Sequence, residues 1–280
     1  MSHTPIWFVT GTSRGLGLAL VRHLLDRGHR VAATTRSTDR LLTALDGAPV
    51  DLLLPLEVDL TSEESVRTAV AATTGRWGAI DVVVNNAGYG YLGAVEETSS
   101  TDVRQLLDVQ VHGTWNVLRA VLPGMRAARS GHVITVSSIL GLLSFPGWGL
   151  YCAAKYAVEG MTESLAAEVA EHGIRVSIVE PGYFDTDFLT ADSLAVTGGA
   201  LDAYPGVRAM IEEHRAMPGT QLGDPVKAAA ALVAVTERAE GPLRQQLGSD
   251  SSALAEGKVA ALAADIAAGR ELARSTDRDR

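Results

Sequence analysis

The sequence predicts an α/β protein built on an open, doubly wound parallel sheet of about seven strands, with helices on both faces. Short β-branched runs alternate with longer amphipathic stretches from Ile6 onward. This order is typical of strand–helix–strand units with right-handed crossovers. Several strand candidates, such as Val82-Val83-Val84, are apolar throughout, as expected of strands that are covered on both faces.

Each predicted strand is a short apolar or β-branched run between turn residues. The run from Ile6 to Thr10 opens the series, and Pro55 interrupts the third strand, where it cannot donate a hydrogen bond. The strands are predicted at residues 6–10, 30–35, 52–58, 80–84, 132–136, 174–179 and 243–247.

Helical spacing of apolar residues fills the intervals between the strands. Thr61 and Glu64 form the pattern of a capping box at the start of one helix. Pro123-Gly124 predicts the end of another helix. Helices are predicted at residues 16–26, 38–45, 101–121, 151–171, 225–238 and 253–273, with a further one beginning after Thr61.

The chain is expected to form one domain over residues 1–280, because no linker-like stretch divides it. Regular spacing weakens beyond Pro181, and residues 188–222 mix Gly, Pro, Asp and Thr with short helical stretches. We interpret this segment as a mobile insertion that covers a substrate site. The helix at 253–273 is expected to cover the same site or to contact a partner.

Composition and charge exclude several classes of protein. With 46% hydrophobic and 20% charged residues, the chain lies in the range of folded globular proteins. A net charge of −9 argues against nucleic acid as the main partner, since phosphate binding needs a basic face. No apolar run is long enough to span a membrane, and the first residues lack the cationic region of a signal peptide.

Cysteine and histidine usage bears on the redox compartment and on metal binding. Cys152 is the only cysteine, so no intramolecular disulfide can form, which fits a reducing compartment. We therefore expect a cytoplasmic protein. The seven histidines show no ligand spacing such as H-E-x-x-H, so no metal site is expected.

The first predicted strand leads directly into a glycine-rich turn that opens a helix, Thr10-Gly11-Thr12-Ser13-Arg14-Gly15-Leu16-Gly17. Glycines in such a turn let the backbone approach a pyrophosphate, whose charge is met by amides at the helix N-terminus. The same residues would also suit a tight turn that binds nothing. The strand–turn–helix context favours a nucleotide.

Four further elements follow the glycine turn in a fixed order. They are Asn85-Asn86-Ala87-Gly88, Ser138, the Y-x-x-x-K pattern of Tyr151 and Lys155, and Pro181-Gly182 followed by Thr186. Together with the turn's T-G-x-x-x-G-x-G, they resemble the short-chain dehydrogenase/reductase family over residues 6 to about 190. The resemblance implies a Rossmann-type fold, a nicotinamide dinucleotide cofactor and oxidoreductase activity.

The resemblance also assigns residues to the cofactor. The turn glycines would face the pyrophosphate, Asp59 and Leu60 would lie against the adenine, and Thr186 would reach the nicotinamide carboxamide. Taken alone, Asp59 is equally a solvated strand end, and Asn86 a turn residue bonded to its own backbone. The cofactor set is Gly11, Thr12, Ser13, Arg14, Gly15, Leu16, Gly17, Arg36, Asp59, Leu60, Asn86, Ala87, Gly88, Tyr151, Lys155, Pro181, Gly182 and Thr186.

The end of the second predicted strand favours NADP(H) over NAD(H). An acidic residue there would bind the ribose 2′-hydroxyl of NAD and repel a 2′-phosphate. The strand ends instead at Thr35-Arg36. Arg36 and Arg14 could hold a phosphate by charge-assisted hydrogen bonds, although each is also explained as an exposed charge at a helix start.

Tyr151 and Lys155 are expected to carry the chemistry. Four residues apart on a predicted helix, their side chains leave the same face, and a nearby ammonium favours the phenolate. Tyr151 would be the general acid/base, and Ser138 would hydrogen-bond the substrate oxygen. Ser137 is the rival for that role, and an ordinary amphipathic Tyr–Lys pair is the plain alternative.

Gln110 departs from the family pattern. The resemblance places an asparagine at this position, where it helps to hold a water that connects the lysine to solvent, through a local bend in the helix. Glutamine keeps the amide but sets it one methylene further out. The substitution therefore bears on the proton relay.

The substrate side is apolar. The loop 139–149 is rich in leucine and aromatic residues, and Phe145, Trp148 and Tyr183 are the substrate-site candidates. They predict a pocket for a hydrophobic ketone, aldehyde or alcohol, unless they bury against the 188–222 segment or a second subunit.

Three functions stay open from the sequence. The leading one is an NADP(H)-dependent carbonyl reductase or alcohol dehydrogenase. The others are an epimerase or dehydratase on the same scaffold, and an NADP-binding sensor that has lost turnover. A homodimer or homotetramer is expected by resemblance to the family, through the helices at 101–121 and 151–171.

Overall fold

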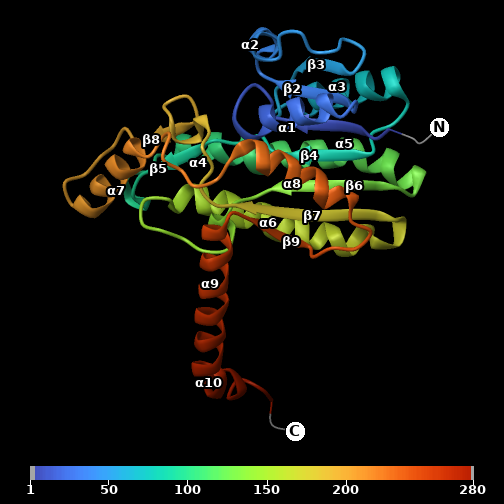
Figure 1. The fold of residues 1–280 in the computed structure, drawn as a ribbon. Coiled ribbons are helices and arrows are strands. Elements are labelled where there is room, and N and C mark those ends of the chain that lie inside the picture. Colours follow the sequence, from blue (N-terminus) through green and yellow to red (C-terminus); the bar gives the residue numbers. More distant parts are fainter. Residues whose placement is uncertain (1–3, 279–280) are drawn as a thin grey trace.

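Seven parallel strands form the central sheet in the computed structural model, which describes residues 4–278. Their order is β3-β2-β1-β4-β6-β7-β9 (Figure 1). The sheet confirms the predicted doubly wound α/β class, and Pro55 lies in the edge strand β3, where proline is tolerated. The strands are β1 (Ile6–Thr10), β2 (Arg30–Thr35), β3 (Leu53–Glu57), β4 (Val82–Asn85), β6 (Gly131–Val136), β7 (Ile174–Pro181) and β9 (Arg244–Leu247).

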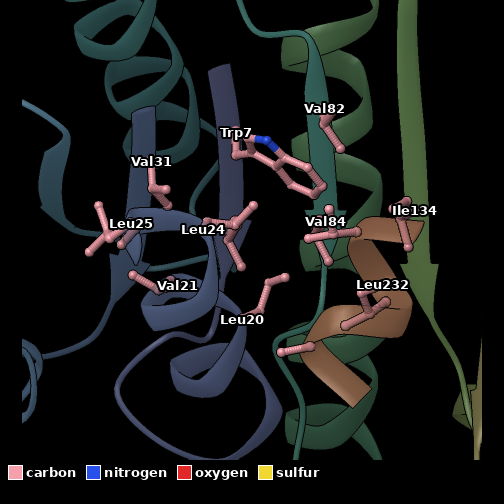
Figure 2. Close-up of a cluster of buried hydrophobic side chains, with 14 of the residues drawn as sticks. Trp7, Leu20, Val21, Leu24, Leu25, Val31, Val82, Val84, Ile134 and Leu232 are labelled. Carbon is pink, nitrogen blue, oxygen red and sulfur yellow. The ribbon is translucent and has the colours of Figure 1, made fainter. Parts of the chain in front are cut away.

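Helices cover both faces of this sheet. On one face, α1 (Gly15–Asp26) and α8 (Pro225–Glu237) bury Leu20, Leu24 and Leu232 against Val84 and Ile134 (Figure 2). On the other face, α3 (Glu63–Trp77), α5 (Gly113–Ala128) and α6 (Gly149–Val169) contribute to a second buried cluster. The short α2 (Thr38–Ala44) links β2 to β3. The strands between these layers are apolar because both of their faces are buried.

The cap of α3 differs from the predicted one. Ser62, not Thr61, is the N-cap, and its hydroxyl accepts a hydrogen bond from the Ser65 backbone N–H. Thr61 is engaged elsewhere, because its backbone N–H and its hydroxyl both donate to the Asp59 carboxylate.

The helix predicted at 101–121 is three consecutive segments. They are α4 (Ser100–Leu107), a π-helical turn over Asp108–His112, and α5, which continues through Pro123 to Ala128. The predicted stop at Pro123-Gly124 is therefore wrong. Both of these residues face solvent, while Val121 and Met125 on the opposite face are buried, so packing against the sheet maintains the helix beyond the proline.

The segment at 188–222 contains one strand that the spacing did not predict, and its helix fits the short helical stretches expected there. β8 (Leu194–Val196) pairs in parallel with β5 (Gly90–Leu92) as a separate small sheet, and α7 (Pro205–Ala216) follows. Short 3-10 turns occur at Val95–Glu97, Ile139–Gly141, Ala170–His172 and Asp187–Leu189.

The C-terminal helix leaves the body of the molecule (Figure 1). α9 (Ser249–Ala268) begins four residues before the predicted start, and α10 (Arg270–Arg274) follows a break at Gly269. Ser251 and Ala255 are buried at its base, whereas the described residues from Val259 onward are exposed. Its outer part therefore does not cover a site on its own chain.

Candidate functional site

A cavity of about 440 Å³ lies at the carboxyl ends of the central strands. This is the edge where open α/β sheets bind their ligands. The cavity is lined at one end by the glycine turn after β1 and at the other by aromatic side chains. It brings together twenty of the predicted site residues, namely Gly11, Ser13, Arg14, Gly15, Leu16, Arg36, Asp59, Leu60, Asn86, Ala87, Gly88, Ser138, Phe145, Trp148, Tyr151, Lys155, Pro181, Gly182, Tyr183 and Thr186.

Three predicted residues do not line the cavity. Thr12 is fully buried, and its hydroxyl donates to the Thr34 carbonyl at 3.0 Å. Gly17 is packed so closely that a Cβ there would lie 2.2 Å from the Gly11 carbonyl oxygen and 2.5 Å from Asn86 Nδ2. Gln110 is also buried. Thr12 and Gly17 therefore shape the turn from behind, and the expectation that Gly17 faces a pyrophosphate is not met.

The glycine turn is held open by specific contacts. Gly11 has a φ of +70° and Gly15 of +56°, the left-handed region that glycine tolerates. Asn86 Nδ2 donates to the carbonyls of Thr10 at 2.9 Å and Gly11 at 3.0 Å. The asparagine therefore ties the turn after β4 to the turn after β1, rather than only to its own backbone.

The turn fits a dinucleotide. The N-cap of α1, Arg14, makes no side-chain cap hydrogen bond, so the N–H groups of the first helical turn have no side-chain acceptor there. A Cβ on Gly15 would meet only Thr186, at 3.8 Å. Unpaired amides at a helix N-terminus beside open space are the requirement for binding a phosphate.

Three arginines gather at the rim beyond β2. Burial first, then the charges of Arg40 and Arg36, lower the pKa of Arg14. Asp192 bridges two of them, with Oδ2 at 2.7 Å from Arg40 NH2 and 3.4 Å from Arg14 NH1. Arg40 was not predicted, and its place one turn into the helix after Arg36 is the signal that would have found it.

Ser138, Tyr151 and Lys155 meet at the other end of the cavity. Ser138 follows β6, while Tyr151 and Lys155 share one face of α6, and all three side chains are largely buried. Lys155 Nζ donates to the Val136 carbonyl at 3.0 Å and lies 5.5 Å from the centroid of the Tyr151 ring.

Burial sets the direction of both pKa shifts in this group. It raises the pKa of Tyr151 above its ordinary value of 10, and the nearby Ser138 hydroxyl offsets only part of the rise. Burial also lowers the pKa of Lys155 to about 8, against the opposing charge of Glu159. Burial therefore favours the phenol form of Tyr151, and the expected effect of the Lys155 ammonium on it stays a prediction.

Gln110 lies in the π-helical turn, so the local bend implied by the resemblance is present. Its Nε2 donates to the Tyr89 carbonyl at 2.8 Å. Among the described residues, its buried Oε1 has no hydrogen-bond partner. A Cβ on Gly88 would lie 3.0 Å from that oxygen, so the amide packs behind the turn after β4.

Aromatic side chains surround Tyr151 at the substrate end. Trp148 packs edge-on at 5.4 Å between ring centroids and Phe188 at 5.7 Å. Tyr183 forms a hydrogen bond with His214 Nε2 at 2.9 Å, which ties it to α7. Sequence patterns missed several apolar lining residues; these are Phe188, Leu189, Leu194 and Leu254. Leu194 lies in β8, which was not predicted, whereas Leu254 lies in the helix predicted at 253–273.

Two structural features are absent from residues 4–278. No group of three or more His, Cys, Asp or Glu side chains in this range is arranged to hold a metal ion. No helix in the same range is long and apolar enough to cross a membrane.

A glycine turn shaped for a dinucleotide, opposite a Ser–Tyr–Lys group, defines a nucleotide-dependent oxidoreductase. The chain belongs to the short-chain dehydrogenase family, whose model matches residues 5–195. Among curated proteins, it is 36% identical to the oxidoreductase BOA17 of Botryotinia fuckeliana, over 96% of this chain and 98% of that one. It is 35% identical to a 3-ketodihydrosphingosine reductase of Bacteroides thetaiotaomicron, over 87% of each.

Solved structures agree with this assignment. A short-chain dehydrogenase from Streptomyces avermitilis superposes with a TM-score of 0.91 at 35% identity, over 99% of this chain and 100% of that one. A short-chain dehydrogenase from Burkholderia cenocepacia, solved with NADP, gives a TM-score of 0.75 at 29% identity, over 95% and 97% of the two chains.

Proposed function

We propose that this protein is an NADP(H)-dependent oxidoreductase that interconverts a hydrophobic ketone or aldehyde and its alcohol. One observation carries the proposal: Ser138, Tyr151 and Lys155 line the same cavity as the glycine turn that fits a dinucleotide. A hydride donor held at the turn and a carbonyl held by Ser138 would therefore meet in one enclosed space.

The cofactor preference rests on charge. Arg14, Arg36 and Arg40 gather beyond β2, and no acidic residue ends that strand. Guanidinium groups bind a 2′-phosphate by charge-assisted hydrogen bonds. The relative from Burkholderia cenocepacia was solved with NADP, which supports the same choice here.

The chemistry follows from the protonation states. When bound, NADPH supplies the hydride that forms the new C–H bond. Tyr151, protonated because burial raises its pKa, donates its proton to the carbonyl oxygen as general acid, and the Ser138 hydroxyl hydrogen-bonds the same oxygen. The carbonyl thus gains a hydride and a proton and becomes an alcohol.

The substrate class rests on the apolar side chains at this end. Trp148, Phe188 and Leu194 line the cavity beside Tyr151, and such surfaces favour apolar ligands. Phe145 also lines the cavity but is 39% exposed, so we assign it to the rim. The relative named for 3-ketodihydrosphingosine reduction supports a substrate with a ketone.

A panel of carbonyl compounds tests this proposal. NADPH consumption is measured with bulky alicyclic, aromatic and long aliphatic ketones and with small polar aldehydes. We expect kcat/KM to be about tenfold or more higher for the bulky ketones, as the burial of a few methylene groups would give. A clear preference for the polar aldehydes would contradict the proposed substrate class.

The two alternative functions rest on fewer observations. An NADP-binding sensor without turnover is favoured by Gln110, whose amide packs behind the turn and leaves Oε1 without a partner among the described residues. NADPH binding with no consumption for any carbonyl would support it. An epimerase or dehydratase would instead change its substrate with no net consumption of NADPH.

We also propose a homo-oligomer of single-domain subunits in a reducing cytoplasm. Cys152 is a buried free thiol, which suits that compartment.

Trp115 on α5 and Tyr156 on α6 are half exposed, on the two helices expected to form an interface. Val259, Leu262 and Ile266 form an exposed apolar stripe on α9 that a second subunit would cover. Light scattering after gel filtration tests the oligomer, and a monomer would contradict it.

A further inference from the structure

Two buried carboxyl groups lie beside the catalytic helix and have no part in the reaction described above. Glu159 on α6 is 4% exposed, and Glu180 on β7 is fully buried. Glu159 stands four residues after Lys155 and eight after Tyr151, so the three side chains share one face of α6. Neither glutamate lines the cavity.

One guanidinium faces both of them. Arg244 Nε on β9 lies 3.1 Å from Glu159 Oε2 and 3.5 Å from Glu180 Oε1. Its NH2 group reaches outward to Glu163 Oε2 at 2.9 Å. Gln246 Nε2 donates to Glu180 Oε2 at 2.6 Å. The two buried carboxyl groups therefore share one guanidinium, whose outer nitrogen already faces Glu163, and buried charge without enough counter-charge is costly.

The hydrogen bonds of the pair are also incomplete. Among the described residues, Glu159 Oε1 and Glu180 Oε1 are buried without a hydrogen-bond partner. A carboxylate only accepts, whereas a protonated carboxyl also donates. A hydrogen bond between the two carboxyl groups raises the pKa of Glu180 and opposes the rise in the pKa of Glu159. One proton held between them would therefore remove the excess negative charge.

The pair is connected to the catalytic group. A Cβ on Gly141 would lie 2.5 Å from Ser137 Oγ and 3.0 Å from Glu159 Oε1, so both atoms border the same point. Ser137 lines the cavity, and a hydrogen bond from its hydroxyl opposes the rise in the pKa of Glu159. The charge of Glu159 also favours the protonated form of Lys155 and opposes the lowering of its pKa by burial.

We propose that Glu159 and Glu180 share one proton and hold Lys155 as an ammonium beside Tyr151, so that Glu159 is a positioning residue for the proposed reaction. The inference rests on the proposed function for its kinetic consequence only. The shared proton itself depends on the geometry of the cluster.

The pair is expected to titrate near neutral pH. Burial first, then the charge of Glu159, raises the pKa of Glu180 to about 7. The charged groups that contact or act on the pair among the described residues are Lys155 on α6 and Arg244 on β9, and Arg244 also pairs with Glu163 on α6. As pH rises through this range the pair loses its proton, and its added negative charge supports the Lys155 ammonium.

Kinetics of matched variants test the positioning role. The reductive kcat/KM is measured against pH for the wild type, Glu159→Gln and Glu163→Gln. Because Lys155 has a pKa of about 8, the alkaline limb of Glu159→Gln should move to lower pH by about one unit, and kcat should fall about tenfold with the KM for NADPH unchanged. Glu163→Gln removes an exposed carboxylate from the same arginine, and its profile should match the wild type. An unmoved limb in Glu159→Gln, or an equal shift in Glu163→Gln, would overturn the inference.

Infrared difference spectroscopy tests the shared proton without any turnover. Between about pH 6 and about pH 9, the wild type should lose the carbonyl stretch of a buried protonated carboxyl group, and Glu180→Gln should lack that band. Absence of the band in the folded wild type would overturn the pair. A wild type that shows the band but reduces no carbonyl would instead contradict the proposed function and leave the pair standing.

Discussion

The two ends of the cavity are built in opposite ways. The nucleotide end consists of turns that directly follow β1 and β4, and it depends on missing side chains: a Cβ on Gly11 or Gly17 would collide with Ala87 or with the Gly11 carbonyl. The substrate end consists of large side chains such as Trp148, Phe188 and Leu254, which come from separate parts of the chain. Substitutions that add atoms should therefore weaken cofactor binding at the nucleotide end. Substitutions that remove atoms should change the substrate selectivity of the substrate end.

The largest effect is expected from adding one methyl group at the nucleotide end. Gly17→Ala places a Cβ 2.2 Å from the Gly11 carbonyl oxygen, which should lower the free energy of unfolding by about 2–3 kcal/mol and abolish tight NADPH binding. Chemical denaturation and fluorescence titration measure the two effects. Gly160→Ala is the control, since that helical glycine has no neighbour within 4 Å and alanine there should stabilise the protein slightly. Equal behaviour of the two variants would contradict the packing account.

Reversing one charge should alter the choice of cofactor. Arg36→Asp removes a cation from the arginine cluster and adds an anion, so the Kd for NADPH should rise about 30-fold, which corresponds to about 2 kcal/mol, while NADH binding is spared. Arg30→Asp is a matched control, because Arg30 is an exposed residue at the opposite end of the same strand, β2. An unchanged NADPH/NADH ratio in Arg36→Asp would contradict the NADP assignment.

Truncation at the substrate end should change selectivity and leave cofactor binding alone. Phe188 packs against Tyr151 at 5.7 Å, so Phe188→Ala should raise the KM for bulky ketones about tenfold, as lost apolar contact would. The Kd for NADPH should remain within about twofold, because the phosphate contacts are unchanged. Steady-state kinetics and a binding titration on one preparation check both values. A rise in the NADPH Kd with no change in the ketone KM would reverse the roles given to the two ends.

The smallest effect is expected near the amino end of the interior strand β6, away from the cavity. Burial first, then Arg175, lowers the pKa of His132 to about 4, and its ring pairs with Ser177 at 2.9 Å. The folded state holds His132 neutral, so the unfolded state binds the extra proton between its own pKa of 6.5 and about 4. The contribution of His132 to the free energy of unfolding is fully present above pH 6.5. About 1–2 kcal/mol of it is lost as the pH falls toward 4. His132→Gln should show less of this loss in thermal melts, with NADPH binding unchanged; an unaltered pH dependence would contradict it.

Sequence patterns predicted the strand, turn and helix of the nucleotide end because these are consecutive in the chain, and the need for Gly11 and Gly15 follows from their positive φ. At the substrate end, Phe145, Trp148 and Tyr183 were predicted. Phe188, Leu194 and Leu254 were missed, since β8 and the base of α9 reach this site only through long-range packing. The helix end predicted at Pro123 was wrong for the same reason. The packing of buried Val121 and Met125 against the sheet outweighs the preference of proline to end a helix. The protonation of Tyr151 depends on burial, which no spacing reveals.

The central claim is that the Tyr151 hydroxyl transfers the proton of the reaction. The most direct measurement compares NADPH consumption and NADPH binding in Tyr151→Phe, with Tyr156→Phe on the same helix as the control. The account predicts that consumption with the best ketone falls by about three orders of magnitude or more in Tyr151→Phe, that NADPH binding stays near the wild-type value, and that Tyr156→Phe retains activity. Retained turnover in Tyr151→Phe would contradict the claim.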